Sequence, residues 1–209
     1  MPADHSIPQL VLASSSPYRQ QLLARLQLPF SCASPDIDES AQPGESASEL
    51  VARLAETKAR ALANRYPEHL IIGSDQVASL ANGDILTKPH HHDAACQQLA
   101  RCSGQTVRFL TGLCLLDSRS GEANTLVEPF DVSFRTLSGQ DIEDYLRLEQ
   151  PYDCAGSFRM EGLGITLFTT FSGRDPNSLI GLPLIALNDL LRAKGVNPLR
   201  AAYLSSSRD

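Results

Sequence analysis

A carboxylate near the end of an aliphatic run is the first residue in this chain that could do chemistry. Residues 70–77 read LIIGSDQV, which predicts a buried strand that ends close to Asp75. Burying a carboxylate costs several kcal/mol unless the group is paired or hydrogen-bonded. Asp75 is therefore either a well-paired structural residue or a working group, and this segment alone leaves both interpretations open.

Four more charged residues fall where predicted elements end, which is where catalytic clefts are usually built. They are Arg19, Glu39, Lys58 and Lys88. Carboxylates can hold a divalent cation while lysine and arginine neutralise phosphate oxygens, the combination that phosphoryl chemistry requires. Each of the four also has an ordinary explanation as a solvated charge, and for any one of them alone that explanation is favoured.

The elements that must position these residues follow an α/β pattern. Strands are expected over 9–13, 30–33 and 70–77, a long hairpin over 106–135, and glycine-punctuated strands over 155–168. Helices are expected to begin near Pro17, Ser46, Asp93, Ser138 and Leu182, each near a capping, proline or periodic apolar pattern. Asn82-Gly83 predicts a tight turn after the central strand.

The loop between the first strand and the first helix suits an anion. Residues 14–16 are three serines, and Pro17 follows them in the first helical turn. The free N–H groups at the start of a helix can hold a phosphate. The loop lacks the spaced glycines and the Gly-Lys-Ser/Thr ending of a P-loop, so that motif is excluded.

Length and charge limit the class of protein. With 209 residues, 42% of them hydrophobic, the chain can bury one substantial core, as a single domain over 1–209 or as two lobes around a central cleft. Segments 1–8 and 199–209 are expected to be flexible tails. A net charge of −6 argues against nucleic-acid binding, although a few cations can still converge on a small anion. No segment predicts a membrane span or a signal peptide, so we expect a cytoplasmic protein.

The cysteine and histidine patterns give little evidence for disulfides or metal sites. The five cysteines are odd in number and include no CxxC pair, which argues against a disulfide framework and a structural zinc site; we expect buried small hydrophobic residues at Cys32, Cys96, Cys102, Cys114 and Cys154. The run His90, His91 and His92 invites a metal-site interpretation. Adjacent side chains point apart, however, so metal binding there is given little weight.

Eight segments in a fixed order carry a resemblance that changes these interpretations. They are LASSSPYRQQLL (12–23), DIDES (36–40), LAETKA (54–59), GSDQV (73–77), TKP (87–89), TG (111–112), AGSF followed by EG (155–162), and GRDPNSLIGLPL (173–184). Together they resemble the Maf family of nucleoside triphosphate pyrophosphatases over most of the chain. The resemblance implies an ITPase-like α/β fold, an elongated and strongly twisted mixed β-sheet flanked by helices, and a homodimer.

The same resemblance implies hydrolysis between the α and β phosphates with the help of a divalent metal, Mg²⁺, Mn²⁺ or Co²⁺. Asp75 matches the family's general base, although direct proton transfer and metal binding are both open to it. Glu39 matches the second acidic residue and is, with Asp75, a candidate metal ligand. The phosphate-binding residues that the matching segments supply are Ser14, Ser16, Arg19, Lys58 and Lys88.

Three positions depart from the commoner family pattern. Tyr18, Gln76 and Glu161 instead resemble the branch of the family that acts on 7-methyl-GTP. One carboxylate can accept both donors of a guanine edge, and a methylated, cationic base favours an aromatic face and an acid. Helix packing for Tyr18 and a solvated strand-end acid for Glu161 are the ordinary alternatives. In a regular strand Asp75 and Gln76 point to opposite faces, so both can line one site only if the strand ends there.

A fourth departure removes a cation. Cys154 stands where many relatives have a lysine, and Arg159 is a candidate replacement for the lost charge. A nucleophilic thiol would need an activating histidine, and none lies in a matching motif, so buried packing of Cys154 is favoured.

Three functions are consistent with the sequence. The first is hydrolysis of 7-methyl-GTP to the monophosphate and pyrophosphate, which clears a modified nucleotide. The second is the same chemistry on dTTP or UTP, against which only Tyr18, Gln76 and Glu161 argue. The third is a nucleotide-binding regulator of cell division with little turnover, a role also associated with the family.

Overall fold

The computed structural model describes residues 8–206, and the chain divides into two compact units. Of the described residues, the first unit contains 8–75, 111–128 and 181–206, and the second contains 76–110 and 129–180. The chain passes from one unit to the other within three of its strands. Apart from Pro8, the tail expected over 1–8 lies outside the described residues.

The strands form a mixed sheet. They are β1 (Leu10–Ala13), β2 (Phe30–Ala33), β3 (Leu70–Leu80), β4 (Ile85–Leu86), β5 (Thr106–Asp117), β6 (Glu122–Phe134) and β7 (Phe168–Gly173). Their order is β2-β1-β3-β5-β6-β7, with β4 beside β3. Strand β1 pairs in parallel with β2 and β3, whereas β4 and β7 pair antiparallel with β3 and β6. The expected fold class, a mixed sheet flanked by helices, is confirmed.

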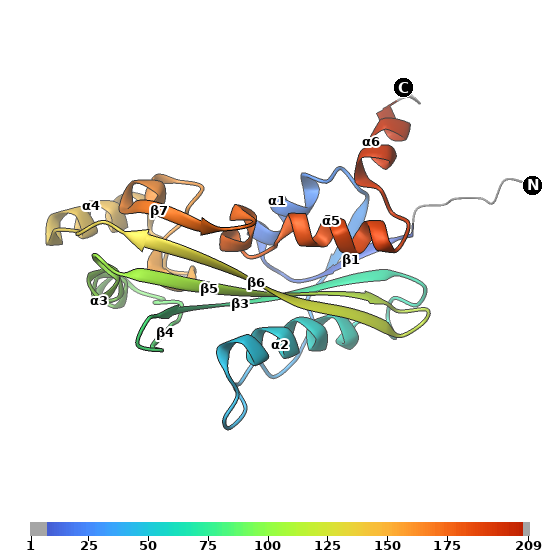
Figure 1. Ribbon diagram of the computed structural model, residues 1–209, viewed down its shortest axis with the longest axis horizontal. Coiled ribbons are helices and arrows are strands. Elements are labelled where there is room, and N and C mark those ends of the chain that lie inside the picture. Colours follow the sequence, from blue (N-terminus) through green and yellow to red (C-terminus); the bar gives the residue numbers. More distant parts are fainter. Residues whose placement is uncertain (1–7, 207–209) are drawn as a thin grey trace, which may run out of the picture. The chain divides into compact units, whose positions relative to one another are not determined.

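In the first unit, helices cover both faces of the sheet. Figure 1 shows α2 (Ala47–Ala61) on one face and α1 (Pro17–Ala24) with α5 (Leu184–Ala193) on the other. Helix α2 packs very closely, because a Cβ atom on Gly73 or Gly112 would lie 2.0 Å from the carbonyl oxygen of Ala55 or Val51. Glycine at these two strand positions therefore lets the backbone of α2 contact the sheet.

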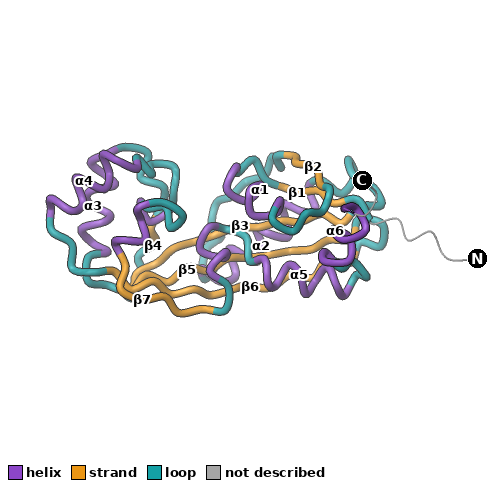
Figure 2. The backbone as a smooth tube through the Cα atoms, turned by 90° about the horizontal axis from the view of Figure 1, so that it is seen from above, coloured by secondary structure: helices purple, strands orange, loops and turns teal. Residues whose placement is uncertain are grey.

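The second unit has its own apolar core. Helices α3 (His92–Cys102) and α4 (Gly139–Glu149) lie side by side (Figure 2), and three short 3-10 helices complete the unit: η1 (Ala155–Ser157), η2 (Leu163–Leu167) and η3 (Pro176–Ile180). This core contains five buried phenylalanines. The ring of Phe158 makes edge contacts with Phe109, Phe134 and Phe168 at centroid distances of 4.8–5.6 Å.

Local capping patterns are confirmed where the sequence placed them. Ser46 and Ser138 each form a capping box with the acid three residues later, at the starts of α2 and α4. Ser16 caps α1, whose first residue is Pro17. These contacts join residues only three positions apart, which is why the sequence alone locates them.

Two segments differ from the expected structure. Residues 155–168 hold η1 and η2 rather than strands, because Gly156 and Ser157 have φ values of +80° and +62°, which a strand does not accommodate. Of the tail expected over 199–209, residues 199–206 belong to helix α6 (Pro198–Ser206), and residues 207–209 lie outside the described part of the chain. Asn197 accepts a hydrogen bond from the backbone of Arg200, and Ala201 is buried.

Among residues 8–206, none of the helices combines the length and the apolar character that crossing a lipid bilayer requires.

Candidate active site

A buried ion pair connects α2 and β3 in the first unit. The Nζ atom of Lys58 lies 2.6 Å from Oδ1 of Asp75, and the two residues are only 6% and 8% exposed. Lys58 comes from the last turns of α2 and Asp75 from β3. The ammonium group offsets the desolvation of the carboxylate, which explains how an acid is tolerated within a core strand.

A second carboxylate contacts the same ammonium group. Oε1 of Glu39 lies 2.9 Å from Nζ of Lys58, but the Glu39 side chain is 59% exposed. Lys58 therefore joins one buried acid and one exposed acid. The three residues that the sequence analysis singled out from separate segments are neighbours.

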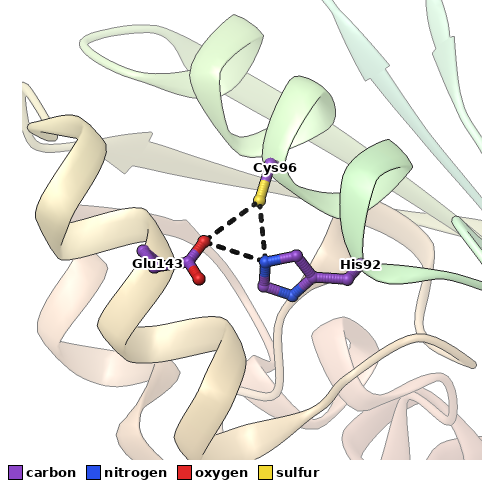
Figure 3. A group of neighbouring side chains, drawn as sticks. All are labelled: His92, Cys96 and Glu143. Atoms are coloured by element: carbon purple, nitrogen blue, oxygen red, sulfur yellow. Dashed lines mark hydrogen bonds and ion pairs between the residues drawn. The ribbon is translucent and has the colours of Figure 1, made fainter.

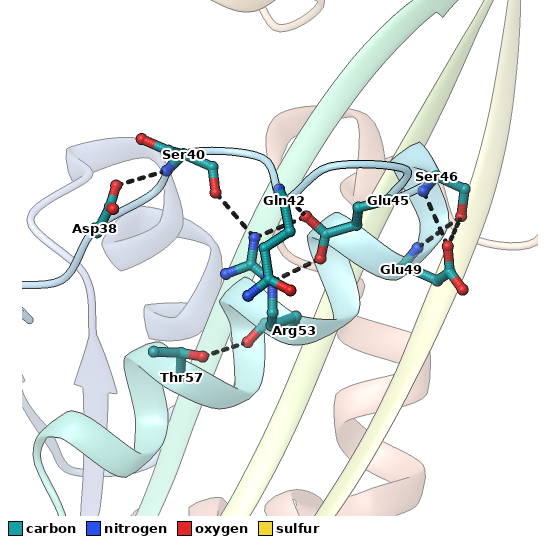
Figure 4. A network of polar contacts seen from close by, with 8 residues as sticks. All are labelled: Asp38, Ser40, Gln42, Glu45, Ser46, Glu49, Arg53 and Thr57. Atoms are coloured by element: carbon teal, nitrogen blue, oxygen red, sulfur yellow. Dashed lines mark hydrogen bonds and ion pairs between the residues drawn. The ribbon is translucent and has the colours of Figure 1, made fainter.

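Helix α2 also fixes the loop that carries Glu39 (Figure 4). The guanidinium of Arg53 donates to both carboxylate oxygens of Glu45 at 2.6 and 2.8 Å and to the carbonyl oxygen of Ser40 at 3.0 Å. The backbone N–H of Ser40 in turn donates to Asp38. Arg53 thus holds the loop at Ser40, the residue after Glu39, and at Glu45, a role that the sequence analysis did not assign.

The electrostatics of this loop reflect the same contact. Hydrogen bonds from Arg53, followed by one from the backbone of Gln42, lower the pKa of Glu45 to about 2. Glu45 therefore stays ionised, and the bidentate contact stays intact, over the whole physiological range of pH.

The serine loop before α1 has the geometry of a helix start. The Oγ atom of Ser14 accepts a hydrogen bond from the N–H of Ser16 at 3.1 Å, and the Oγ atom of Ser16 accepts one from the N–H of Arg19 at 3.4 Å. Ser14 is buried and Ser16 is half-buried. The predicted phosphate-binding serines thus shape the loop and the first turn of α1, the part of a helix that favours anions.

Arg19 is held by a backbone carbonyl of the segment before α5. Its Nε atom donates to the carbonyl oxygen of Gly181 at 2.8 Å. Burial lowers the pKa of the Arg19 guanidinium, and the negative charges of Asp75 and Glu39 act in the opposite direction. Arginine stays protonated in proteins, so Arg19 supplies a fixed positive charge that interacts with both acids.

Ser74 shares that carbonyl oxygen and is a residue that sequence reasoning missed. Its Oγ atom lies 2.9 Å from the carbonyl oxygens of both Gly181 and Gly112, and the residue is fully buried. Ser74 therefore helps to place the acceptor that orients Arg19. The available sequence pattern was a hydroxyl within a buried aliphatic run, one position before the acid.

The first unit consequently brings together two carboxylates, two cations and a serine-lined helix start. Two carboxylates that reach one ammonium group can also reach one metal ion, and carboxylate oxygens are the ligands that Mg²⁺ prefers. Asp75 and Glu39 therefore fit the divalent metal that the sequence analysis expected. Lysine and arginine beside them suit an anionic substrate.

In the second unit, Gln76 positions a turn. Its Nε2 atom donates to the carbonyl oxygens of Ser178 and Leu179, at 2.6 and 3.3 Å, and so holds helix η3. Strand β3 does not end at Gln76 but continues to Leu80, so Asp75 and Gln76 point to opposite faces of a continuous strand. The condition set for both side chains to line one site is not met, and the role of Gln76 in specificity stays a prediction.

The other assigned residues are accessible to solvent. Lys88 is exposed between β4 and α3, Glu161 is exposed between η1 and η2, and Tyr18 is half-buried in α1, next to Arg19. Their assignments to phosphate or base binding stay predictions.

The expected burial of all five cysteines is wrong for three of them. Cys102 and Cys114 are buried, whereas Cys32 is exposed and Cys96 and Cys154 are half-buried. The thiol of Cys154 lies 3.5 Å from Oδ1 of Asp153. Arg159 is the candidate replacement for the missing lysine. It forms an ion pair with Oε2 of Glu149 in α4 at 3.0 Å, which neutralises part of its positive charge.

Comparison with known proteins gives consistent similarities. A family model described as Maf-like protein matches residues 9–194. A protein of Pseudomonas fluorescens named 7-methyl-GTP pyrophosphatase is 61% identical over 187 residues, which cover 90% of this chain and 97% of that protein. A protein of Nitrosococcus oceani with the same name is 60% identical over 188 residues, which cover 90% and 94%. Among solved structures, a HAM1 protein from Coxiella burnetii covers 61% of this chain and 73% of its own, with 16% identity and a TM-score of 0.45.

Proposed function

The chain belongs to the Maf family, and from this premise we propose that it is a nucleoside triphosphate pyrophosphatase that acts on 7-methyl-GTP. The products would be the nucleoside monophosphate and pyrophosphate. Relatives that are 59–61% identical over about nine tenths of the chain carry the name 7-methyl-GTP pyrophosphatase, which supports this choice of substrate.

The observation that carries the proposal is the contact of Lys58 with both Asp75 and Glu39. A buried acid held at a core strand by one lysine suits a general base, because its position is fixed and its surroundings exclude bulk water. Asp75 would accept a proton from the attacking water. The exposed carboxylate of Glu39 would contact the ammonium group of Lys58 from the solvent side.

The cations have complementary tasks. Lys58 and Arg19 would stabilise negative charge on the phosphate oxygens, which increases as pyrophosphate leaves. The N–H groups at the start of α1, shaped by Ser14 and Ser16, would bind a further phosphate oxygen. Lys88 is assigned to phosphate binding through the family motif alone.

Asp75 and Glu39 are the residues that would hold a divalent metal. When bound, Mg²⁺, Mn²⁺ or Co²⁺ would supply positive charge to the phosphate oxygens. The proposal also includes a cytoplasmic location and a homodimer, both of which stay predictions.

A nucleotide panel tests the proposal. Purified full-length protein would be incubated with 7-methyl-GTP, GTP, dTTP and UTP in the presence of Mg²⁺, Mn²⁺ or Co²⁺, and pyrophosphate release would be measured. We expect the highest kcat/KM for 7-methyl-GTP. Preference for dTTP or UTP would favour the alternative substrate, and binding without turnover of any nucleotide would favour the regulator.

A further inference from the structure

Three side chains of different chemistry converge between α3 and α4 in the second unit (Figure 3). His92 and Cys96 lie four residues apart on α3 and therefore share one face of that helix, and Glu143 faces them from α4. The Sγ atom of Cys96 lies 3.4 Å from Nε2 of His92 and 3.9 Å from Oε2 of Glu143. The same Nε2 and Oε2 atoms lie 2.8 Å apart.

These separations are close to those around a tetrahedral zinc ion. With metal-ligand distances of about 2.0 Å for nitrogen and oxygen and about 2.3 Å for sulfur, neighbouring ligand atoms lie about 3.3–3.5 Å apart. The observed distance of 3.4 Å lies within this range, and those of 2.8 and 3.9 Å lie below and above it. Small rotations of the side chains would therefore give all three atoms a common centre.

Neighbouring residues orient two of the three ligand groups. The Nδ1 atom of His92 lies 3.1 Å from the hydroxyl of Tyr152, so the second ring nitrogen has a partner and Nε2 can act as the ligand. Arg147 forms an ion pair with Oε1 of Glu143, which leaves Oε2 directed at His92 and Cys96. Metal-binding histidines and carboxylates commonly have outer partners of this kind.

We propose that His92, Cys96 and Glu143 form a Zn²⁺-binding site in which a water molecule completes the tetrahedron. One nitrogen, one sulfur and one oxygen ligand together suit Zn²⁺. They do not suit Mg²⁺, which prefers oxygen ligands only. The side chains of His92 and Glu143 are 31% and 33% exposed, which gives an ion and its water access. The site is independent of the proposed nucleotide hydrolysis.

The adjacent histidines His90, His91 and His92 do not predict a metal site, because adjacent side chains point apart. The relevant spacing is instead His92 to Cys96 on one helix turn, and the third ligand lies 51 residues from His92. Only the packing of α3 on α4 brings the carboxylate to the other two groups.

Cobalt is a direct probe of this ligand set. Metal-free, full-length protein would be titrated with Co²⁺ while its absorption spectrum is recorded, because a thiolate ligand produces a charge-transfer band that oxygen ligands do not. We expect one equivalent of Co²⁺ to produce this band and Zn²⁺ to remove it by displacement. The band should be lost in Cys96→Ser.

Further variants separate ligands from supporting residues. His92→Gln and Glu143→Gln should weaken binding at least about ten-fold, and Tyr152→Phe, which leaves all three ligands in place, should weaken it by about ten-fold. Cys32→Ser, at an exposed cysteine of the first unit, and Asp75→Asn should leave the band unchanged.

Circular dichroism would establish that each variant is folded. The proposal is wrong if the parent protein shows no thiolate band, or if the band persists in Cys96→Ser. An unchanged cobalt affinity in folded Tyr152→Phe and His92→Gln would also overturn it, since the three residues would then form only a contact between the two helices.

Discussion

The ammonium group of Lys58 lies 2.6 Å from the carboxylate of Asp75, and both residues are almost completely buried. A pair of this kind adds little net stability, because a well-packed hydrophobic pair of similar volume often does as well or better. Its presence on a core strand beside an exposed second acid, Glu39, is more easily explained by chemistry than by stability.

Replacing Asp75 tests the chemical role directly. Asp75→Asn keeps the shape of the side chain but removes the base, so we expect pyrophosphate release to fall by about 10²- to 10⁴-fold while the fold is retained. Asp36→Asn, at an exposed acid in the loop between β2 and α2, is the matched control and should stay active. Activity of Asp75→Asn near the parent level would refute the assigned role.

Removing the lysine should have a different effect. Lys58→Met leaves a buried carboxylate without its cation, and we expect the free energy of unfolding to fall by about 3–5 kcal/mol in a denaturant titration. Combining Lys58→Met with Asp75→Asn should recover part of this loss, because no buried charge is left unpaired. A loss below about 1 kcal/mol in the single variant would contradict the buried-pair interpretation.

The loop that carries Glu39 should depend on Arg53 in a pH-dependent way. Hydrogen bonds from Arg53, followed by one from the backbone of Gln42, lower the pKa of Glu45 from 4.5 to about 2, so the ion pair contributes fully above pH 4.5 and is lost as the pH falls from there towards 2. In Arg53→Gln the pKa of Glu45 should move back towards 4.5. A titration of the Glu45 carboxyl carbon by NMR measures this, and an unchanged midpoint would show that Arg53 is not the cause.

Sequence patterns predicted the parts of this protein that depend on near neighbours. The caps at Ser16, Ser46 and Ser138 follow from contacts over three residues, and the strand that carries Asp75 follows from a local aliphatic run. The resemblance identified Lys58 and Glu39 but not their shared contact. That contact depends on the packing of α2, which no local pattern encodes.

Long-range contacts account for what was missed. Ser74 donates to Gly181 over 107 positions, and only the assembled fold makes that contact visible. The glycine pattern of segment 155–168 predicts strands, but glycine punctuates both strands and tight helical turns. The positive φ values of Gly156 and Ser157 show that this segment forms turns.

Ser74 itself gives a fourth prediction. Ser74→Ala removes the donor to two buried carbonyl oxygens, and we expect the free energy of unfolding to fall by about 1–3 kcal/mol. Because Gly181 also orients Arg19, the KM for the nucleotide should rise as well. Ser79→Ala, at a half-buried position of the same strand, is the control. A loss of stability with an unchanged KM would separate Ser74 from the placement of Arg19.

Base specificity gives the last prediction, and the structure distinguishes the two candidate readers within the second unit. The amide nitrogen of Gln76 already donates to Ser178 and Leu179, whereas Glu161 is exposed. Glu161 is therefore the better candidate for accepting the donors of a guanine edge.

Glu161→Gln replaces a carboxylate that accepts two hydrogen bonds with an amide that accepts and donates. We expect the ratio of kcat/KM for 7-methyl-GTP to that for UTP to fall by about 10-fold or more, because a mismatched polar contact leaves a buried donor of the base unpaired. Asp144→Asn, at another exposed acid of the same unit, should leave the ratio unchanged. An unchanged ratio in Glu161→Gln would mean that other residues read the base, whereas a parallel loss on both nucleotides would assign Glu161 to turnover and not to specificity.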